Sequence, residues 1–198
     1  DHLRTMGQLM EDTLTQVEAR VENSRDGITG IPTGFSDLDK LTSGWQRGEL
    51  DILAARPAVG KTAFALHLAK TAAASGYHTV VFSLEMQGER LGDRWLLAAT
   101  EDVDASHMRR GLLDTGELRQ VREASRQLSQ LSIRVDDSPV VSMDHVRSVA
   151  RMLKSKGECD MIILDYLQLC DMKSDQNNRN REQEVAQATR KAKLMAKE

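Results

Sequence analysis

The side chains best suited to chemistry stand in one run of eight residues, Ala55-Arg56-Pro57-Ala58-Val59-Gly60-Lys61-Thr62. This run follows a short apolar stretch at 50–54 and precedes a stretch with helical spacing at 63–69. A strand, a tight loop that ends in Gly-Lys-Thr and a helix together predict a phosphate-binding loop. All eight residues are expected to bind nucleotide, because such a loop offers backbone N–H groups and a helix N-terminus to phosphate oxygens. Lys61 is expected to reach the β- and γ-phosphates, and the Thr62 hydroxyl to bind Mg²⁺.

Ala55 departs from the general pattern, which has its first glycine there. Alanine serves at that position if its φ is negative, as it is at the end of a strand. A bare Gly-Lys followed by Ser or Thr arises by chance in roughly one chain in ten of this length, given the ordinary frequency of glycine. The interpretation therefore depends on the strand before the loop and the helix after it.

Two acidic residues follow predicted strands and are expected to complete the site. Asp165 ends the apolar run 161–164, and a carboxylate there needs a cation or a donor, which Mg²⁺ held jointly with Thr62 supplies. The alternative for Asp165 is an N-cap of the next element. Glu85 ends the strand 79–84 and could deprotonate the water that attacks the γ-phosphate. From the residues alone, a solvent-facing acid at a strand end remains open for Glu85.

A polar stretch at 171–181 is the candidate contact for nucleic acid. Arg179, Arg181 and the neighbouring asparagines can donate to phosphate oxygens, while a merely solvated loop remains the alternative. The net charge of −3 argues against a surface that is basic throughout, but it leaves a local basic strip possible.

The elements that must position these groups alternate between strands and helices. The predicted strands are 50–55, 78–84, 133–135 and 161–164, and the predicted helices are 63–74, 87–100, 114–131, 142–155 and 182–198. This alternation predicts an α/β fold with a mostly parallel, doubly wound sheet whose strand ends form the site. Before it, apolar residues spaced three or four apart from Leu3 to Val21 predict an amphipathic helix. Its apolar stripe must pack on its own domain or on a neighbouring subunit.

Composition excludes several other classes of protein. The chain of 198 residues is 40% hydrophobic and 29% charged, and it has no apolar run of about 18 residues, so no membrane contact is expected. There is no charged-then-apolar leader, so we expect a cytoplasmic protein. Cys159 and Cys170 have no His or Cys nearby and are expected to be reduced thiols.

Four blocks of the sequence resemble the DnaB-type replicative DNA helicases. They are Gly30-Ile31-Pro32-Thr33-Gly34-Phe35 with Leu38-Asp39, the stretch 54–66, Phe82-Ser83-Leu84-Glu85-Met86, and Asp165-Tyr166-Leu167-Gln168-Leu169. Alanine at position 55 is normal in that family. The resemblance runs from about residue 10 to residue 198.

The resemblance implies a RecA-like P-loop ATPase domain at 27–198, preceded by a linker helix at 1–26 that docks on the adjacent subunit of a six-membered ring. It assigns catalysis to Glu85 and Lys61, and it makes Asp165 the Walker B acid. It places Arg179, Asn180, Arg181 and Glu182 in a segment that binds single-stranded DNA. The implied function is ATP-driven translocation on DNA and unwinding at the replication fork.

The family also has features that this sequence lacks. Its sheet continues with a strand that bears a phosphate-sensing glutamine, and a basic finger from one subunit reaches the ATP of the next. The resemblance thus implies a domain incomplete at its C-terminal end that hydrolyses ATP poorly, and primase and loader contacts through absent parts. Two alternatives remain: a recombination ATPase of the RadA/RecA type, and a ring-forming ATP-dependent switch that binds protein.

Overall fold

A computed structural model describes residues 3–24, 26–56, 58–138, 142–165 and 178–198, with side chains in the last range from Glu182 onward. The chain divides into two compact units, Asp1–Arg47 and Gly48–Glu198. Each unit is considered by itself below.

A parallel sheet forms the centre of the second unit. Its strands β1 (Thr79–Ser83), β2 (Ile133–Asp136) and β3 (Met161–Asp165) are ordered β2-β1-β3. Both pairings are parallel, and Ser83 at the end of β1 stands opposite Asp165 at the end of β3. All five residues of β1 are buried, as expected for a central strand covered on both faces.

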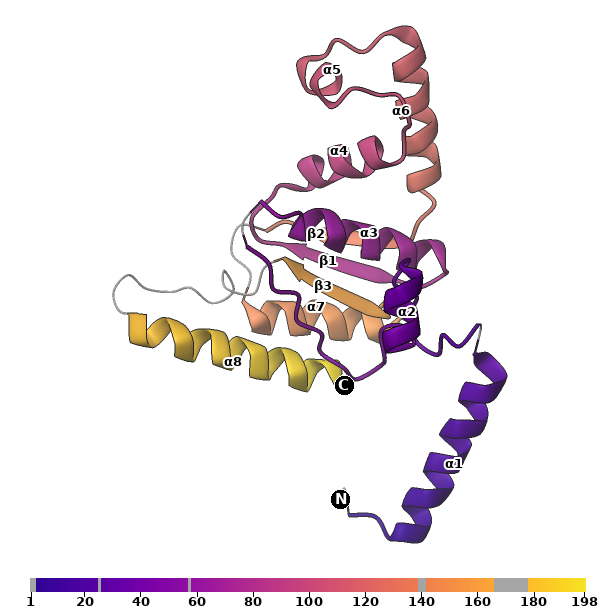
Figure 1. Cartoon of the computed structure of the whole chain (residues 1–198). Helices are drawn as coiled ribbons and strands as arrows, with labels where there is room; N and C mark the ends of the chain where they lie inside the picture. Colours follow the sequence, from indigo (N-terminus) through magenta and orange to yellow (C-terminus); the bar gives the residue numbers. More distant parts are fainter. Residues whose placement is uncertain (1–2, 25, 57, 139–141, 166–177) are drawn as a thin grey trace. The chain divides into compact units, whose positions relative to one another are not determined.

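Helices cover the two faces of the sheet (Figure 1). On one face Val81 packs against residues of α3 (Lys61–Ala74) and α4 (Gly88–Ala98). On the other face Val80 and Phe82 pack against α7 (Met143–Ser155). The last helix, α8 (Asn178–Ala196), packs on α7 through Ala188 and Ala192. Since successive side chains of a strand point to opposite faces, this arrangement confirms the predicted doubly wound α/β fold.

Capping side chains set the starts of several helices. Ser142 is the N-cap of α7 and accepts a hydrogen bond from the His145 N–H at 3.1 Å, as predicted. A capping box of Asp114 and Glu117 starts α6 (Thr115–Leu128), which packs against α4. A short helix that we did not predict, α5 (Ala105–Arg110), is capped by Asp104.

The predicted strand at 50–55 is wrong. Residues 50–56 have no regular secondary structure, and in the described part of the chain no strand pairs with them. Residues 51–56 are exposed, and Leu50 is the residue of this stretch that packs against the core, beside Leu84 and Leu164. An apolar run becomes a strand through hydrogen bonds to a neighbouring strand, and that requirement is invisible in local sequence.

The first unit contains α1 (Met6–Asn23) and a short helix, α2 (Ser36–Thr42), that we did not predict. Thr5 and Gln8 form a capping box at the start of α1, and within the described chain none of the residues of α1 is buried. An isolated antiparallel β-bridge joins Ile31, before α2, to Trp45, after it. Gly30 is required there, because a Cβ on it would stand 2.3 Å from the carbonyl oxygen of Trp45.

Candidate nucleotide-binding site

The carboxyl edge of the sheet brings together three of the predicted site residues. The Thr62 hydroxyl donates a hydrogen bond to Oδ2 of Asp165 at 2.7 Å. The Lys61 ammonium lies 3.7 Å from Oδ1 of the same carboxylate. Asp165 is 8% exposed, so its charge is held largely away from water and is compensated by these two neighbours. The end of the loop and the end of the apolar strand therefore lie together, as expected for residues that share one site.

The backbone at the loop end prepares a helix N-terminus for an anion. Gly60, the N-cap of α3, has φ of 101°, a conformation that glycine adopts readily. No side chain of the described residues caps α3 at this end. The first N–H groups of a helix have no partner within the helix, and together with the helix dipole they attract phosphate oxygens.

Two further loop positions bear on the predicted geometry. Ala55 is not among the described residues with positive φ, which is the condition under which alanine replaces the first glycine. Ala58, by contrast, has φ of 64°, which the sequence did not predict because L-residues seldom adopt it. Pro57 lies outside the described residues.

The oxygen atoms of Thr62 and Asp165 fit a magnesium ion. Mg²⁺ in nucleotide sites typically takes one or two carboxylates, a hydroxyl and the phosphates themselves, in place of a cage built wholly by the protein. The hydroxyl and carboxylate of this pair are hard oxygen ligands at the mouth of the loop. Their chemistry matches what a bound triphosphate with Mg²⁺ requires.

Glu85 lies at the same edge of the sheet, in the turn after β1. It is exposed, and it comes two residues after Ser83, the register partner of Asp165. The Leu84 N–H donates to the carbonyl oxygen of Asp165 at 2.9 Å, which extends the pairing of β1 and β3 to the residue before Glu85. The exposed Glu85 carboxylate is accessible to water.

Ser83 is a residue of this site that sequence reasoning missed. It is 3% exposed, and its hydroxyl donates to the Met86 carbonyl at 2.7 Å and accepts from the Met86 N–H at 3.3 Å. These bonds close the turn that presents Glu85. The available signal was a serine at the end of an apolar strand, since serine hydroxyls often bond to backbone groups of the next turn.

The predicted DNA-binding residues are only partly described. The backbone of Arg179, Asn180 and Arg181 belongs to the first turn of α8, but their side chains lie outside the described part of the chain. Glu182 is exposed. Of the two cysteines, Cys159 is a half-buried free thiol whose pKa is raised by burial, and Cys170 lies outside the described residues.

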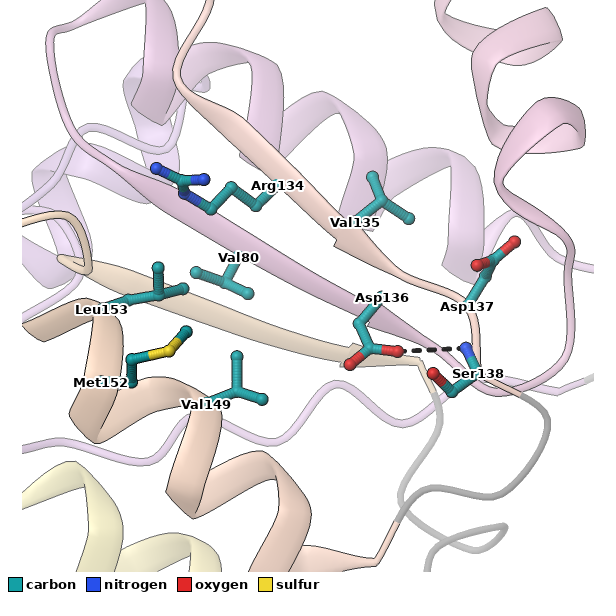
Figure 2. Close-up of a pocket in the computed structure, with 9 residues that line it drawn as sticks. All are labelled: Val80, Arg134, Val135, Asp136, Asp137, Ser138, Val149, Met152 and Leu153. Carbon is teal, nitrogen blue, oxygen red and sulfur yellow. Dashed lines mark hydrogen bonds between the residues drawn. The ribbon is translucent and has the colours of Figure 1, made fainter.

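A separate open groove of about 640 Å³ lies between β2 and α7 (Figure 2). Residues 134–138 line it from one side, and Val149, Met152 and Leu153 line it from the other. At its end, Asp136 accepts from the Ser138 N–H at 3.0 Å and lies 2.7 Å from His145 Nε2. Burial alone raises the pKa of Asp136, but the hydrogen bonds from Ser138 and His145 outweigh burial and hold that pKa below its usual value.

Comparison with known sequences identifies the family. Residues 30–198 match the family described as the DnaB-like helicase C-terminal domain. The chain is 42% identical over 193 residues to the replicative DNA helicase DnaB of Geobacillus stearothermophilus, covering 96% of this chain and 42% of that protein. It is 40% identical over 195 residues to the replicative DNA helicase DnaC of Bacillus subtilis, again covering 42% of the relative. The chain thus spans less than half the length of these two relatives.

Solved structures agree with the sequence relatives. One solved ATPase domain superimposes with a TM-score of 0.82 at 29% identity, covering 94% of this chain and 66% of that one. A DnaB-like replicative helicase studied with its primase interactions superimposes with a TM-score of 0.81 at 30% identity, covering 96% of this chain and 48% of that one. These neighbours bear out the predicted RecA-like fold, and the relatives named here give no support to the recombination alternative. The chain therefore belongs to the family of DnaB-like helicase C-terminal domains.

Proposed function

We propose that this chain is the motor domain of a replicative DNA helicase, which binds ATP with Mg²⁺ and uses its hydrolysis to move along single-stranded DNA and unwind the duplex at the fork. The observation that carries the proposal is the contact of Thr62 with Asp165 beside Lys61, at the carboxyl edge of a RecA-like sheet. A Gly-Lys-Thr that arose by chance would not be expected to have a buried carboxylate in contact with its Lys and its Thr. The names of the relatives supply the class of motor.

Each residue has a definite task in this proposal. The loop 55–62 binds the triphosphate through its backbone N–H groups, and Lys61 neutralises charge on the β- and γ-phosphates. Thr62 and Asp165 hold Mg²⁺, which supplies further positive charge at the phosphates when it is bound. Glu85 accepts a proton from the attacking water, because it is exposed and directly follows Leu84, whose N–H bonds to the carbonyl of Asp165.

The proposed partners follow from the same family. Single-stranded DNA binds along Arg179, Asn180, Arg181 and Glu182, and six copies form a ring in which the apolar stripe of α1 docks on the adjacent subunit. Primase is a further partner, since one solved neighbour is described with its primase interactions; a helicase loader is another. We place the protein in the cytoplasm, where chromosomal DNA lies in bacteria. Within the described residues no helix is long and apolar enough to cross a membrane.

A binding measurement tests the nucleotide site. Lys61→Ala should weaken ATP binding about 10- to 100-fold, the value of one or two charge-assisted hydrogen bonds. Lys70→Ala is the matched control, because Lys70 lies on the same helix away from the loop. Unchanged ATP affinity in the Lys61 variant would overturn the proposal.

A second measurement tests the motor. Single-stranded DNA should stimulate ATP hydrolysis by the full-length protein, and Arg181→Ala should reduce that stimulation while Arg190→Ala, on the exposed part of α8, should not. The full-length protein should also unwind a forked duplex. Stimulation by a protein in place of DNA would favour the ATP-dependent switch, and strand exchange without unwinding would favour the recombination ATPase.

A further inference from the structure

The turn that carries Glu85 is held at both of its ends, and one of the holding residues directly follows another strand, β2. We propose that Asp137, the residue after β2, is a positioning residue for Glu85: it binds the N-terminus of α4 and so fixes the far end of the turn at residues 84–87. This inference rests on the proposed function, in which Glu85 is the general base. Asp137 touches neither nucleotide nor Mg²⁺ in this scheme.

The near end of the turn is fixed by β1 and β3. The buried Ser83 hydroxyl bonds to both backbone groups of Met86, and the Leu84 N–H bonds to the Asp165 carbonyl at 2.9 Å. Glu85 thus follows a residue that is tied directly to the strand bearing the proposed metal ligand. The side chain of Glu85 is still free to swing if Gln87 and the start of α4 can move.

The far end is fixed by Asp137. Gln87 is the N-cap of α4, but its side chain makes no capping bond, and the Gly88 N–H donates instead to Oδ2 of Asp137 at 2.7 Å. A carboxylate at this place satisfies an N–H group that has no partner inside the helix and lies at the positive end of the helix dipole. Figure 2 shows the Asp137 carboxylate pointing away from that of Asp136, which faces the groove. Because successive side chains point to opposite sides of an extended chain, Asp136 bonds at the groove while Asp137 bonds to the start of α4.

Gly88 fits this contact closely. A Cβ on Gly88 would stand 3.2 Å from Oδ2 of Asp137, so any larger residue would push the carboxylate back by a few tenths of an ångström. The short hydrogen bond from the Gly88 N–H to Asp137 is therefore possible without strain because Gly88 has no side chain. A carboxylate that merely pointed into solvent near α4 would not need this close approach.

The test uses steady-state ATP hydrolysis by the full-length protein. Asp137→Ala should lower kcat about 3- to 30-fold with KM for ATP unchanged, because small misplacement of a catalytic group costs rate while the phosphate-binding loop is untouched. Asp137→Asn keeps an oxygen acceptor and should restore kcat to within about 2-fold of wild type. Gly88→Ala keeps the Asp137 side chain but displaces its carboxylate, so it should lower kcat by part of the same amount, and it keeps the proposal testable if Asp137→Ala folds poorly. Asp114→Ala removes a cap of the same kind from α6 and should leave kcat unchanged.

The decisive comparison is made in the Glu85→Gln background. If Asp137 acts through Glu85, Asp137→Ala should cost little further rate there, because the group that it positions is already lost. An equal loss of kcat in both backgrounds, or an Asp137→Asn variant as slow as Asp137→Ala, would overturn the proposal. A Glu85→Gln variant with the kcat of wild type would instead refute the proposed role of Glu85. Because that measurement involves no Asp137 variant, the two proposals fail in distinguishable ways.

Discussion

Thr62 and Asp165 are 103 positions apart in the chain, yet the hydroxyl of one donates to the carboxylate of the other at 2.7 Å. Thr62 lies in the first turn of α3, and Asp165 is the last residue of β3, whose carboxyl end faces that turn. Helix α3 packs on the sheet through Leu66 and Ala69, and this packing brings its first turn to the end of β3 although nothing local in sequence joins the two residues.

This contact predicts a magnesium-dependent effect of Asp165→Ala. ATP affinity measured with Mg²⁺ should fall about 10- to 100-fold, because a charged ligand of the ion is lost. Affinity measured with excess chelator should not fall, since the variant removes a negative charge near the phosphates. Isothermal titration calorimetry in both buffers checks this, with Asp144→Ala on the exposed surface of α7 as control. Equal losses with and without Mg²⁺ would mean that Asp165 supports the loop itself and holds no metal.

Glu85→Gln separates hydrolysis from binding. The variant should lower kcat by about 10²- to 10⁴-fold, the usual contribution of a general base, while ATP affinity stays near that of wild type. Its melting temperature should not change, because the side chain is exposed. Glu89→Gln, an exposed acid in the first turn of α4, is the matched control and should hydrolyse ATP normally. The prediction fails if both variants lose rate to the same extent.

Sequence predicted those parts of the fold and site that local chemistry dictates. The apolar run before Asp165 specified the strand β3, although residues 161–164 are only partly buried there, and Ser142 specified the start of α7. The meeting of Thr62 with Asp165 was expected of a loop at the carboxyl edge of a parallel sheet. The strand expected before that loop does not form, and the contact is made from the first turn of α3. These signals need only the residue types and their order.

The remaining features depend on long-range contacts. Residues 50–55 have strand-like composition but form no strand, because strand formation requires a paired neighbour. The positive φ of Ala58 is imposed by the loop around it, since alanine alone disfavours that conformation. The bond from Gly88 to Asp137 joins residues 49 positions apart, and no spacing rule predicts it.

The stripe of α1 predicts self-association. Met10, Leu14 and Val17 are 50%, 59% and 43% exposed on one helix, and burying the exposed half of such side chains between subunits yields about 1 kcal/mol each. Leu14→Asp should therefore shift assembly of the full-length protein toward smaller species in sedimentation velocity. Gln16→Asp adds the same charge on the opposite side of the helix and should leave the assembly intact. A ring that tolerates Leu14→Asp would show that the stripe does not lie at the subunit contact.

Asp136, at the end of the groove, should make the free energy of unfolding depend on pH. The lowered pKa of Asp136 in the folded chain means that its ionised form stabilises the fold at neutral pH. That contribution is fully present above the unfolded pKa of about 4 and is lost as the pH falls through the lower folded value. Asp136→Asn should thus be less stable than wild type in urea unfolding at pH 7, and the difference should shrink below about pH 4. Val135→Ala in the same strand carries no titratable group, so its stability loss should stay constant over this range. A pH-independent difference for Asp136→Asn would mean that the hydrogen bonds, and not the charge, stabilise this end of β2.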